Sequence, residues 1–261
     1  MTDLSLVVTA HNETLVCGPT MHSADLAVAA ARARGFTVQT VIALDRATEA
    51  TTAYFNQPAF DHWERWVMTE GDLGRVRNAL VPRLDGRFVA FLDSDDLFSE
   101  NWLAEGVAAL VAAEERGERV IAHPEVNMIF DGVRAVLHNV DSDSELFTPY
   151  FLALRNCYDS LCLTPREAHL DVPYVHRDIP NGLSYQDWQF AVETLERGWR
   201  HVVVPDTIIF KRRRDSSLMM ESKQRRSLTR SLPALAVDRI RDLRSGRGRL
   251  PAPERGTGAG A

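Results

Sequence analysis

Residues 87–96 have the sequence RFVAFLDSDD, in which an apolar run leads directly into three aspartates. The run over residues 87–92 has the length and composition of a strand that is buried on both faces of a sheet. Side chains along a strand alternate between its faces, so Asp93 and Asp95 point to the same side if the extended backbone continues. The stretch therefore predicts a buried strand that carries carboxylates to one edge of a sheet.

The acidic cluster itself has two interpretations. Three adjacent carboxylates repel one another, and a divalent cation would neutralise them. Oxygen-only ligands suit Mg²⁺ or Mn²⁺, which also bind substrate phosphates. Alternatively, the run is a turn followed by a helix cap at Asp96 or Ser99, with the other carboxylates in solvent.

The chain on the N-terminal side of this strand alternates short apolar runs with helical segments, which is typical of βαβ units on a parallel sheet. We expect strands over residues 4–9, 38–44 and 63–69, and helices over residues 21–34 and 73–84. Polar residues follow several of these strands. The carboxyl ends of parallel strands converge on the crevice where open α/β sheets bind ligands, so we expect the site there.

The second half of the chain departs from this alternation. Asp131-Gly132 lies between apolar runs at residues 125–130 and 133–140 and predicts a β-hairpin. We expect helices over residues 102–116, 144–154 and 187–197, strands over residues 160–164 and 201–210, and a charged helical arm over residues 221–243. Residues 245–261 are rich in Gly, Pro and Ala, which predicts a disordered tail.

Composition and charge exclude several functional classes. A content of 45% hydrophobic and 25% charged residues excludes disordered and fibrous proteins. The formal net charge of -6 argues against nucleic-acid binding, because attraction to phosphates requires a dominant basic face. A local basic cluster, KRRR, does occur at residues 211–214.

The cysteines and the apolar segments bear on the compartment. Cys17, Cys157 and Cys162 have neither a disulfide-framework nor a zinc-site spacing, which favours reduced thiols in a cytoplasm. The N-terminus lacks the pattern of a signal peptide, and no apolar run approaches the roughly 20 residues that cross a bilayer. We therefore expect a cytoplasmic protein without a transmembrane segment, and peripheral membrane contact stays open.

The loop after the first expected strand has the sequence AHNE, residues 10–13, and is not glycine-rich. Neither GxGxxG nor GxxxxGK[ST] occurs in the chain, so the common dinucleotide and P-loop sites are unsupported. A nucleotide can still be held by backbone groups and by Asp45, whose carboxylate can accept from a base N–H. The alternative is that these residues form an ordinary polar loop and turn.

Four segments, taken in order, resemble family-2 glycosyltransferases of the GT-A fold. They are VVTAHNE at residues 7–13, VIALDRATEAT at 41–51, GDLGRVRNALVPRLDGRFVAFLDSDDLFSENWL at 71–103 and YQDWQFAVETLERGW at 185–199. The resemblance extends over residues 4–218. It implies an α/β fold with a Rossmann-like, mostly parallel sheet flanked by helices, a small antiparallel hairpin and a C-terminal helical arm.

The same resemblance implies a division of labour along one domain. Residues 1–98 would bind the nucleotide sugar, residues 99–220 would bind the acceptor, residues 221–244 would form the arm and residues 245–261 the tail. It assigns the nucleotide base to Ala10, Glu13 and Asp45. Arg77 would contact the pyrophosphate or uridine, and Arg75 is a weaker candidate for that contact.

The resemblance assigns the DxD motif of the family to Asp93 and Asp95. Asp93 would contact the ribose, and Asp95 would bind Mn²⁺ or Mg²⁺ between the two phosphates, with Asp96 as a supplement. Many relatives have a His after the last strand, where this chain has arginines up to Arg214. An Arg cannot bind a cation, but its forked donors can neutralise a diphosphate. The alternative for the arginines is a solvated basic face.

The family's catalytic base corresponds to Asp187, in the sequence Gln186-Asp187-Trp188. Gln186 replaces the acidic neighbour that is usual in the family. The alternative is that Asp187 is only the N-cap of a helix. The resemblance implies inverting transfer of a sugar from a nucleotide diphosphate, UDP foremost, to an acceptor hydroxyl on a glycan, lipid-linked or small molecule.

The acceptor region is expected around the hairpin and residues 156–182. Its aromatic side chains could stack on a sugar or belong to the core; they are Tyr158, Tyr174, His176 and Trp188. Two other functions remain open. A sugar-nucleotidyltransferase would also use an α/β nucleotide site with a cation, although AHNET lacks the glycine- and arginine-rich loop that such enzymes share. A non-catalytic nucleotide-sugar-binding protein is the second, because of Gln186 and the missing His.

Overall fold

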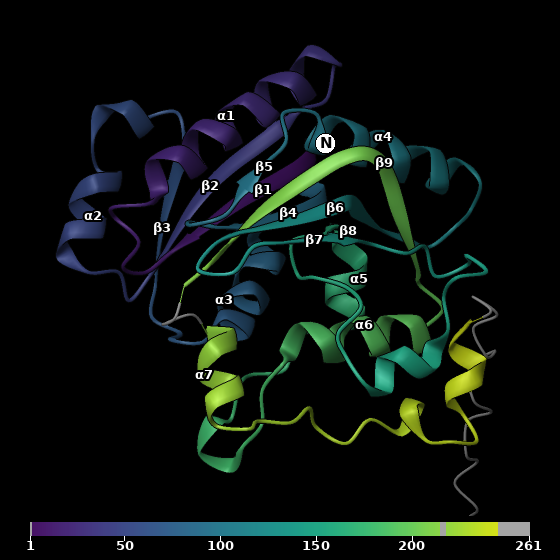
Figure 1. Ribbon diagram of the computed structural model, residues 1–261. Coiled ribbons are helices and arrows are strands. Elements are labelled where there is room, and N and C mark those ends of the chain that lie inside the picture. The colour runs from purple at the N-terminus through teal and green to yellow at the C-terminus, as the bar shows by residue number, and fades with distance from the viewer. Residues whose placement is uncertain (1, 215–217, 245–261) are drawn as a thin grey trace, which may run out of the picture.

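The computed structural model describes residues 2–214 and 218–244. In this part of the chain, nine strands form one sheet in the order β3-β2-β1-β4-β8-β6-β9-β5, with β7 paired to β6 (Figure 1). The strands are β1 Thr2–Ala10, β2 Val38–Asp45, β3 Glu64–Met68, β4 Gly86–Asp93, β5 Leu97–Phe98, β6 Val120–Asp131, β7 Ala135–His138, β8 Leu163–Pro165 and β9 Arg200–Arg213. Strands β3, β2, β1 and β4 are mutually parallel, whereas β8 joins β4 and β6 in antiparallel pairing.

Helices cover both faces of the sheet. They are α1 Cys17–Ala33, α2 Glu49–Phe55, α3 Leu73–Leu80, α4 Trp102–Glu115, α5 Arg166–Asp171, α6 Gln186–Glu196 and α7 Leu218–Gln224. In Figure 1, α1 and α4 lie on one face, and α3, α5 and α6 lie on the other. The fold is thus a mixed α/β sheet flanked by helices, as the resemblance implied.

The apolar runs of the sequence supply the central strands. Leu6 and Val8 of β1 pack in the core beneath α1 and α4, while Val7, between them, packs with Val76 of α3 on the opposite face. Burial of both faces explains why residues 88–92 are continuously apolar, because β4 lies beside β1 in the same layer. This packing fixes the carboxyl ends of β1, β2 and β4 along one edge.

Most expected elements are confirmed, including the four parallel strands and the hairpin, in which Ile129 pairs with Ala135. The helix expected over residues 144–154 is wrong: that stretch contains only the 3-10 turn Pro149–Ala153. Pro149 lacks the N–H that a helix interior requires. The strand expected over residues 160–164 is shorter and shifted, at Leu163–Pro165.

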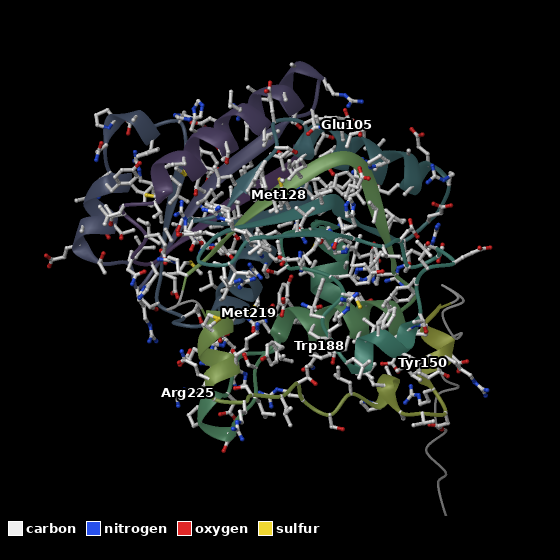
Figure 2. The ribbon with its side chains drawn as sticks, viewed as in Figure 1. Glu105, Met128, Tyr150, Trp188, Met219 and Arg225 are labelled. Carbon is white, nitrogen blue, oxygen red and sulfur yellow. The ribbon has the colours of Figure 1, made fainter. Side chains whose placement is uncertain are left out.

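The C-terminal arm is helical over a much shorter length than expected. Only α7, Leu218–Gln224, is α-helical, and the remainder has two 3-10 turns, Pro233–Leu235 and Ile240–Arg244. Pro233 interrupts any continuous helix over residues 221–243. Figure 2 shows α7 running from Met219 beside the sheet to Arg225 farther from it. The tail predicted at residues 245–261 lies outside the described residues.

Two further expectations from the sequence concern a helix cap at Ser99 and the absence of a membrane-spanning segment. Ser99 does not cap α4: the capping position belongs to Asn101, and the Ser99 hydroxyl accepts from the Ile208 backbone N–H of β9 over 3.0 Å. The serine therefore joins two parts of the sheet. None of the described helices has the length and apolar character that crossing a bilayer requires.

Candidate active site

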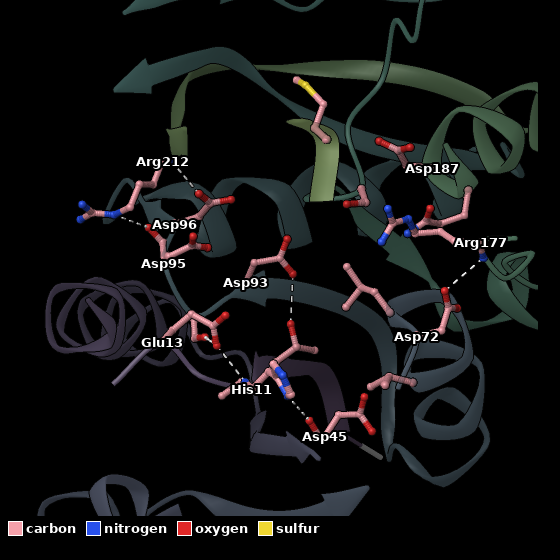
Figure 3. Close-up of a pocket in the computed structure, with 18 of the residues that line it drawn as sticks. His11, Glu13, Asp45, Asp72, Asp93, Asp95, Asp96, Arg177, Asp187 and Arg212 are labelled. Carbon is pink, nitrogen blue, oxygen red and sulfur yellow. Dashed lines mark hydrogen bonds between the residues drawn. The ribbon is translucent and has the colours of Figure 1, made fainter. Parts of the chain in front are cut away.

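A pocket of about 600 Å³ opens at the carboxyl ends of the parallel strands. Ala10 of β1, Asp45 of β2 and Asp93 of β4 reach it from the sheet, and the end of β9 and the start of α6 complete its wall. In Figure 3, Glu13, Asp95 and Asp96 lie on one side of the pocket, and Arg177 and Asp187 on the other. The expected location of the site, in the crevice beyond the strand ends, is therefore confirmed.

The structure brings together all but two of the residues that the resemblance assigned to the donor, the cation or the base. Those lining the pocket are Ala10, Glu13, Asp45, Asp93, Asp95, Asp96, Asp187 and Arg214. One exception is Arg77, which is 1% exposed and lies beneath the pocket floor. Arg75, the weaker candidate, is exposed on α3 and does not line the pocket either.

Glu13 organises the loop after β1. Its Oε2 accepts from the backbone N–H groups of His11 and Asn12, each over 2.8 Å, and from the Ser94 hydroxyl over 3.2 Å. Its other oxygen, Oε1, is 3.8 Å from the guanidinium of Arg214. One carboxylate thus ties the first loop to the turn after β4 and adds negative charge to that corner.

Asp45 clamps a neighbouring turn. Its two carboxylate oxygens accept from the backbone N–H groups of Glu70 and Gly71 over 2.7 and 2.8 Å. Gly71 has a φ of +68°, a left-handed backbone conformation that favours glycine. The structural role of Asp45 is therefore clear, and its contact with a nucleotide base stays a prediction.

Asp93 lies at the centre of the pocket and is held from below. Its Oδ1 accepts from the Thr9 hydroxyl over 3.0 Å and from Nη2 of Arg77 over 3.2 Å. The Arg77 guanidinium also lies over the rings of Phe91 and Tyr174, 5.1 and 5.4 Å from their centroids. Burial alone would lower the pKa of Arg77, but Asp93 and other negative groups such as Asp187 together outweigh this effect and raise it. Arg77 is thus a buried counter-ion of Asp93.

Asp96 does not cap a helix, contrary to one interpretation of the sequence. It is buried, and its Oδ1 accepts from the Arg212 backbone N–H of β9 over 2.7 Å. Lys211 Nζ is 3.7 Å from its Oδ2 and donates to both carboxylate oxygens of Asp159, each over 2.7 Å. Burial raises the pKa of Asp96, whereas the Lys211 charge opposes the rise. The third aspartate of the cluster therefore fastens β9 to the turn.

Asp95 faces the pocket and forms an ion pair with the end of β9. Nη2 of Arg214 donates to its Oδ2 over 2.6 Å. Burial raises the pKa of Asp95, and Asp93 adds to the rise, whereas the positive charge of Arg214 lowers it. Arg212 pairs with Asp131 over 3.0 Å. The interpretation of the arginines as a solvated basic face is therefore wrong for Arg212 and Arg214.

Asp187 lies in the first turn of α6, on the pocket wall across from the aspartates that follow β4. The N-cap position belongs to Tyr185, which has a left-handed backbone, so the capping interpretation of Asp187 is wrong. Nδ2 of Asn156 donates to Asp187 Oδ2 over 2.8 Å. Burial raises the pKa of Asp187 and the charge of Asp159 raises it further, while Lys211 has the opposite effect.

The aromatic residues expected on the acceptor side are mostly structural. Tyr158 and Tyr174 are buried, and Tyr158 stacks on His201 while its hydroxyl donates to the Val140 carbonyl. Trp188 donates to the Leu152 carbonyl over 2.7 Å. Of the aromatic side chains near α6, Tyr185 lines the pocket. Tyr185 begins the segment at residues 185–199 that carries the resemblance, but it was assigned no role.

Arg177 also lines the pocket and was missed by the sequence analysis. Its Nη2 lies 2.8 Å from Glu221 of α7, and its backbone N–H donates to Asp72 at the start of α3. Met219 and Ser222 of α7 line the same wall. The segment after β9 therefore returns to close one side of the pocket, a tertiary relationship that no local motif encodes.

The acidic side chains of the pocket decide whether it can hold a divalent cation. Among residues 2–214 and 218–244, no group of three or more His, Cys, Asp and Glu side chains is placed to hold a metal ion. Asp95 is nevertheless a carboxylate on the pocket surface, and Mg²⁺ is commonly bound by one or two carboxylates together with substrate phosphates and water. The site fits a cation that shares its ligands with a phosphorylated substrate.

Comparisons with known proteins give similarity only at the level of structure. No protein-family model and no curated protein sequence matches the chain. The crystal structure of S. aureus TarS 1-349 in complex with UDP-GlcNAc matches 84% of this chain with a TM-score of 0.61 and 16% identity. GalNAc-T7 with UDP, GalNAc and Mn²⁺ matches 82% of it with a TM-score of 0.58 and 14% identity.

The chain spans less than two thirds of these proteins: 61% of the TarS chain and 44% of the GalNAc-T7 chain. The TarS structure with UDP gives a similar match, with a TM-score of 0.58 over 82% of this chain at 16% identity. Identities this low establish the fold rather than the substrate. The curled, mostly parallel sheet, its flanking helices and these neighbours identify the chain as a protein with the GT-A fold of nucleotide-sugar transferases.

Proposed function

We propose that this protein is an inverting glycosyltransferase that moves a sugar from a UDP-sugar to an acceptor hydroxyl. The observation that carries the proposal is the placement of Asp187 across one pocket from Asp93 and Asp95. A carboxylate opposite a diphosphate-binding corner is the arrangement that in-line displacement at an anomeric carbon requires. The neighbouring TarS structure contains UDP-GlcNAc, and the neighbouring GalNAc-T7 structure contains UDP. Both support a uridine nucleotide as the donor.

The donor would lie along the strand ends. We assign the base to Ala10, Glu13 and Asp45, and the ribose to Asp93, which Arg77 and Thr9 hold in place. Arg214 and its neighbour Arg213 line the side of the pocket next to Asp95 and would donate to the diphosphate. Guanidinium groups suit this task because their forked N–H groups match phosphate oxygens.

Asp95 would hold a divalent cation, Mn²⁺ or Mg²⁺, together with the diphosphate oxygens. When bound, such a cation stabilises the negative charge that develops on the leaving phosphate. The chain's contribution is a carboxylate that is fixed in the turn after β4 and faces the donor. The Mn²⁺ in the GalNAc-T7 structure supports this assignment.

Asp187 would act as the general base. It would accept the acceptor's hydroxyl proton while the oxygen attacks the face of the sugar opposite the nucleotide, so that the configuration inverts. Its raised pKa strengthens it as a base. Gln186, on the same pocket wall, supplies hydrogen-bonding groups without a second charge.

We also propose that the enzyme works in the cytoplasm. Cys17, Cys157 and Cys162 are all unpaired, and Cys17 and Cys162 are buried. Free thiols of this kind are typical of a reducing compartment.

The acceptor would enter from the side of the pocket formed by α6 and Arg177, where Tyr185 offers an aromatic face.

The first test is a binding screen followed by a transfer assay. Thermal unfolding is followed with UDP and UDP-sugars, with and without MnCl2; a ligand at 100 times its Kd adds about 2.7 kcal/mol to stability. Asp187→Asn is expected to reduce turnover about 10²–10⁴-fold and to leave UDP affinity unchanged. The matched control is Glu193→Gln on the same helix, which removes a charge away from the pocket.

The outcomes separate the functions that the sequence leaves open. Wild-type turnover in Asp187→Asn would refute the assignment of the base. Pyrophosphate release from a nucleoside triphosphate would identify a sugar-nucleotidyltransferase instead. UDP-sugar binding without hydrolysis or transfer over a broad panel of hydroxyl acceptors would identify a non-catalytic binding protein.

A further inference from the structure

The contact between Arg214 and Asp95 places a positive charge on the carboxylate that the proposed function assigns to the cation. Nη2 of Arg214 lies 2.6 Å from Oδ2 of Asp95 and 3.8 Å from Oε1 of Glu13. Both carboxylates are 16% exposed at the side chain, and both line the pocket. The guanidinium thus lies between the carboxylates of Asp95 and Glu13.

This corner is a poor site for a free cation. No group of three or more potential ligands is assembled anywhere in residues 2–214 and 218–244, so Asp95 would supply most of the protein's share of the coordination. A cation that reached Asp95 without a donor would face the charge of Arg214 at the same oxygen. Two unit charges a few ångströms apart at a protein surface interact strongly enough to change affinity ten-fold or more.

Not every N–H group of the Arg214 guanidinium has a hydrogen-bond partner among the described residues. Its Nε is buried and has no hydrogen-bond partner among the described residues, while its side chain is 34% exposed. The side chain extends from the end of β9, and it lines the pocket beside Arg213. The Arg214 side chain is therefore exposed enough to move away from Asp95, and it has an unpartnered N–H group that could donate to a new oxygen.

We propose that Arg214 is an internal counter-ion that holds Asp95 until the donor binds, and then exchanges Asp95 for the donor's diphosphate as a divalent cation takes its place. The inference rests on the proposed function. The exchange conserves charge, because the diphosphate and the cation bring equal and opposite charges. Asp95 passes from one cation to another, and Arg214 passes from a carboxylate to phosphate oxygens.

The exchange makes two measurable demands. Mn²⁺ alone binds weakly to the wild-type protein, because it must displace Arg214 without giving it a new anion. Mn²⁺ and UDP increase each other's affinity, because together they supply both new partners, and such coupling is reciprocal. Removing the charge at position 214 is expected to raise the affinity for free Mn²⁺ about ten-fold and to reduce its coupling to UDP.

The test measures Mn²⁺ binding, by calorimetry and by the spin-resonance signal of unbound Mn²⁺, to the full chain with and without UDP. Arg214→Gln is compared with wild type. Arg213→Gln removes the same charge from the adjacent residue, whose side chain forms no ion pair with a described residue, so it should change free-Mn²⁺ affinity much less. Arg214→Met serves if the Gln variant does not fold, and Arg214→Lys should keep the weak binding of wild type.

Unchanged affinity for free Mn²⁺ in Arg214→Gln, or an equal gain in Arg213→Gln, would overturn the exchange. UDP binding to the wild-type protein that is equally tight with and without a metal chelator would also overturn the exchange, because Arg214 would then replace the cation permanently. In both cases UDP still binds, and the proposed function stands. A wild-type protein that binds neither UDP nor UDP-sugars with Mn²⁺ would instead refute the proposed function.

Discussion

Asn156 donates a hydrogen bond from Nδ2 to Oδ2 of Asp187 over 2.8 Å, and its own Oδ1 accepts from the Tyr158 backbone N–H over 3.2 Å. The amide is thereby fixed at both ends, and it orients the carboxylate that we assign as the base. A hydrogen bond to the charged form of a carboxylate favours that form.

Asn156→Ala is therefore expected to raise the pKa of Asp187 and to move the acid limb of the kcat/KM profile to higher pH. Asn156→Asp should move it further, because a second carboxylate repels the charge of the first. The profile is measured with a UDP-sugar from the binding screen. Identical acid limbs in wild type and Asn156→Ala would mean that the amide only packs there.

The wild-type pH profile has a predictable sign. The base must be unprotonated, so activity falls as pH drops through the pKa of Asp187. Because burial and Asp159 raise that pKa, the acid limb should lie above the ordinary aspartate value of about 3.9. A kcat/KM profile that stays flat down to pH 4 would contradict a buried carboxylate base.

Lys211 is expected to be the main electrostatic support of the pocket wall. Its side chain is 13% exposed and lies between Asp159 and Asp96. Burial alone would lower the pKa of Lys211, but these two carboxylates outweigh that effect and raise it. Lys211→Met leaves two largely buried carboxylates without their cation and should cost about 3 kcal/mol in the free energy of unfolding.

Urea-induced unfolding measures this cost. The double variant Lys211→Met with Asp159→Asn should recover part of the loss, because one of the stranded charges is then removed. A single variant as stable as wild type would show that solvent already screens the three groups.

Asp45 should affect both stability and nucleotide binding. Asp45→Ala removes the acceptors of the Glu70 and Gly71 N–H groups and should cost about 1–3 kcal/mol in the free energy of unfolding. It should also weaken UDP binding in calorimetry. Asp61→Ala, which removes an exposed partner of Arg65, is the control and should change stability by less than about 1 kcal/mol.

The two arginines of α3 should behave differently. Arg77→Met leaves Asp93 without its buried counter-ion and should reduce UDP affinity, although the guanidinium does not reach the pocket. Arg77→Lys should not restore it, because an ammonium cannot reproduce the stacking between Phe91 and Tyr174. Arg75→Met should bind UDP as wild type does, and a loss there would reverse the assignment.

Much of the fold could be predicted from the sequence because its central strands are mostly apolar. Residues 88–92 and 4–9 are buried on both faces, so their pattern is simple, and the acidic run after residue 92 falls at the sheet edge. The helix expected over residues 144–154 is wrong because Pro149 interrupts that stretch. The arm failed similarly at Pro233.

The candidate site was predicted where a residue follows a strand and was missed where it depends on distant segments. Asp45 and Asp93 end their strands, and Glu13 and Asp95 come shortly after the ends of theirs. Arg77 looked like a ligand contact because its burial beneath Asp93 depends on Phe91 and Tyr174, and Tyr174 lies on a segment that sequence alone does not place. Arg177 was missed because its partner, Glu221, lies 44 residues further along the chain.

The positive partners of the acidic corner arrive late in the chain. Lys211 Nζ lies 3.7 Å from Oδ2 of Asp96, and Nη2 of Arg214 donates to Oδ2 of Asp95 over 2.6 Å, both where the final strand of the sheet ends. During synthesis, the ribosome releases β1 to β4 with their clustered aspartates long before β9 emerges. The unfinished protein therefore carries a self-repelling patch at its functional edge, and competence to bind a nucleotide sugar comes only with the closing strand.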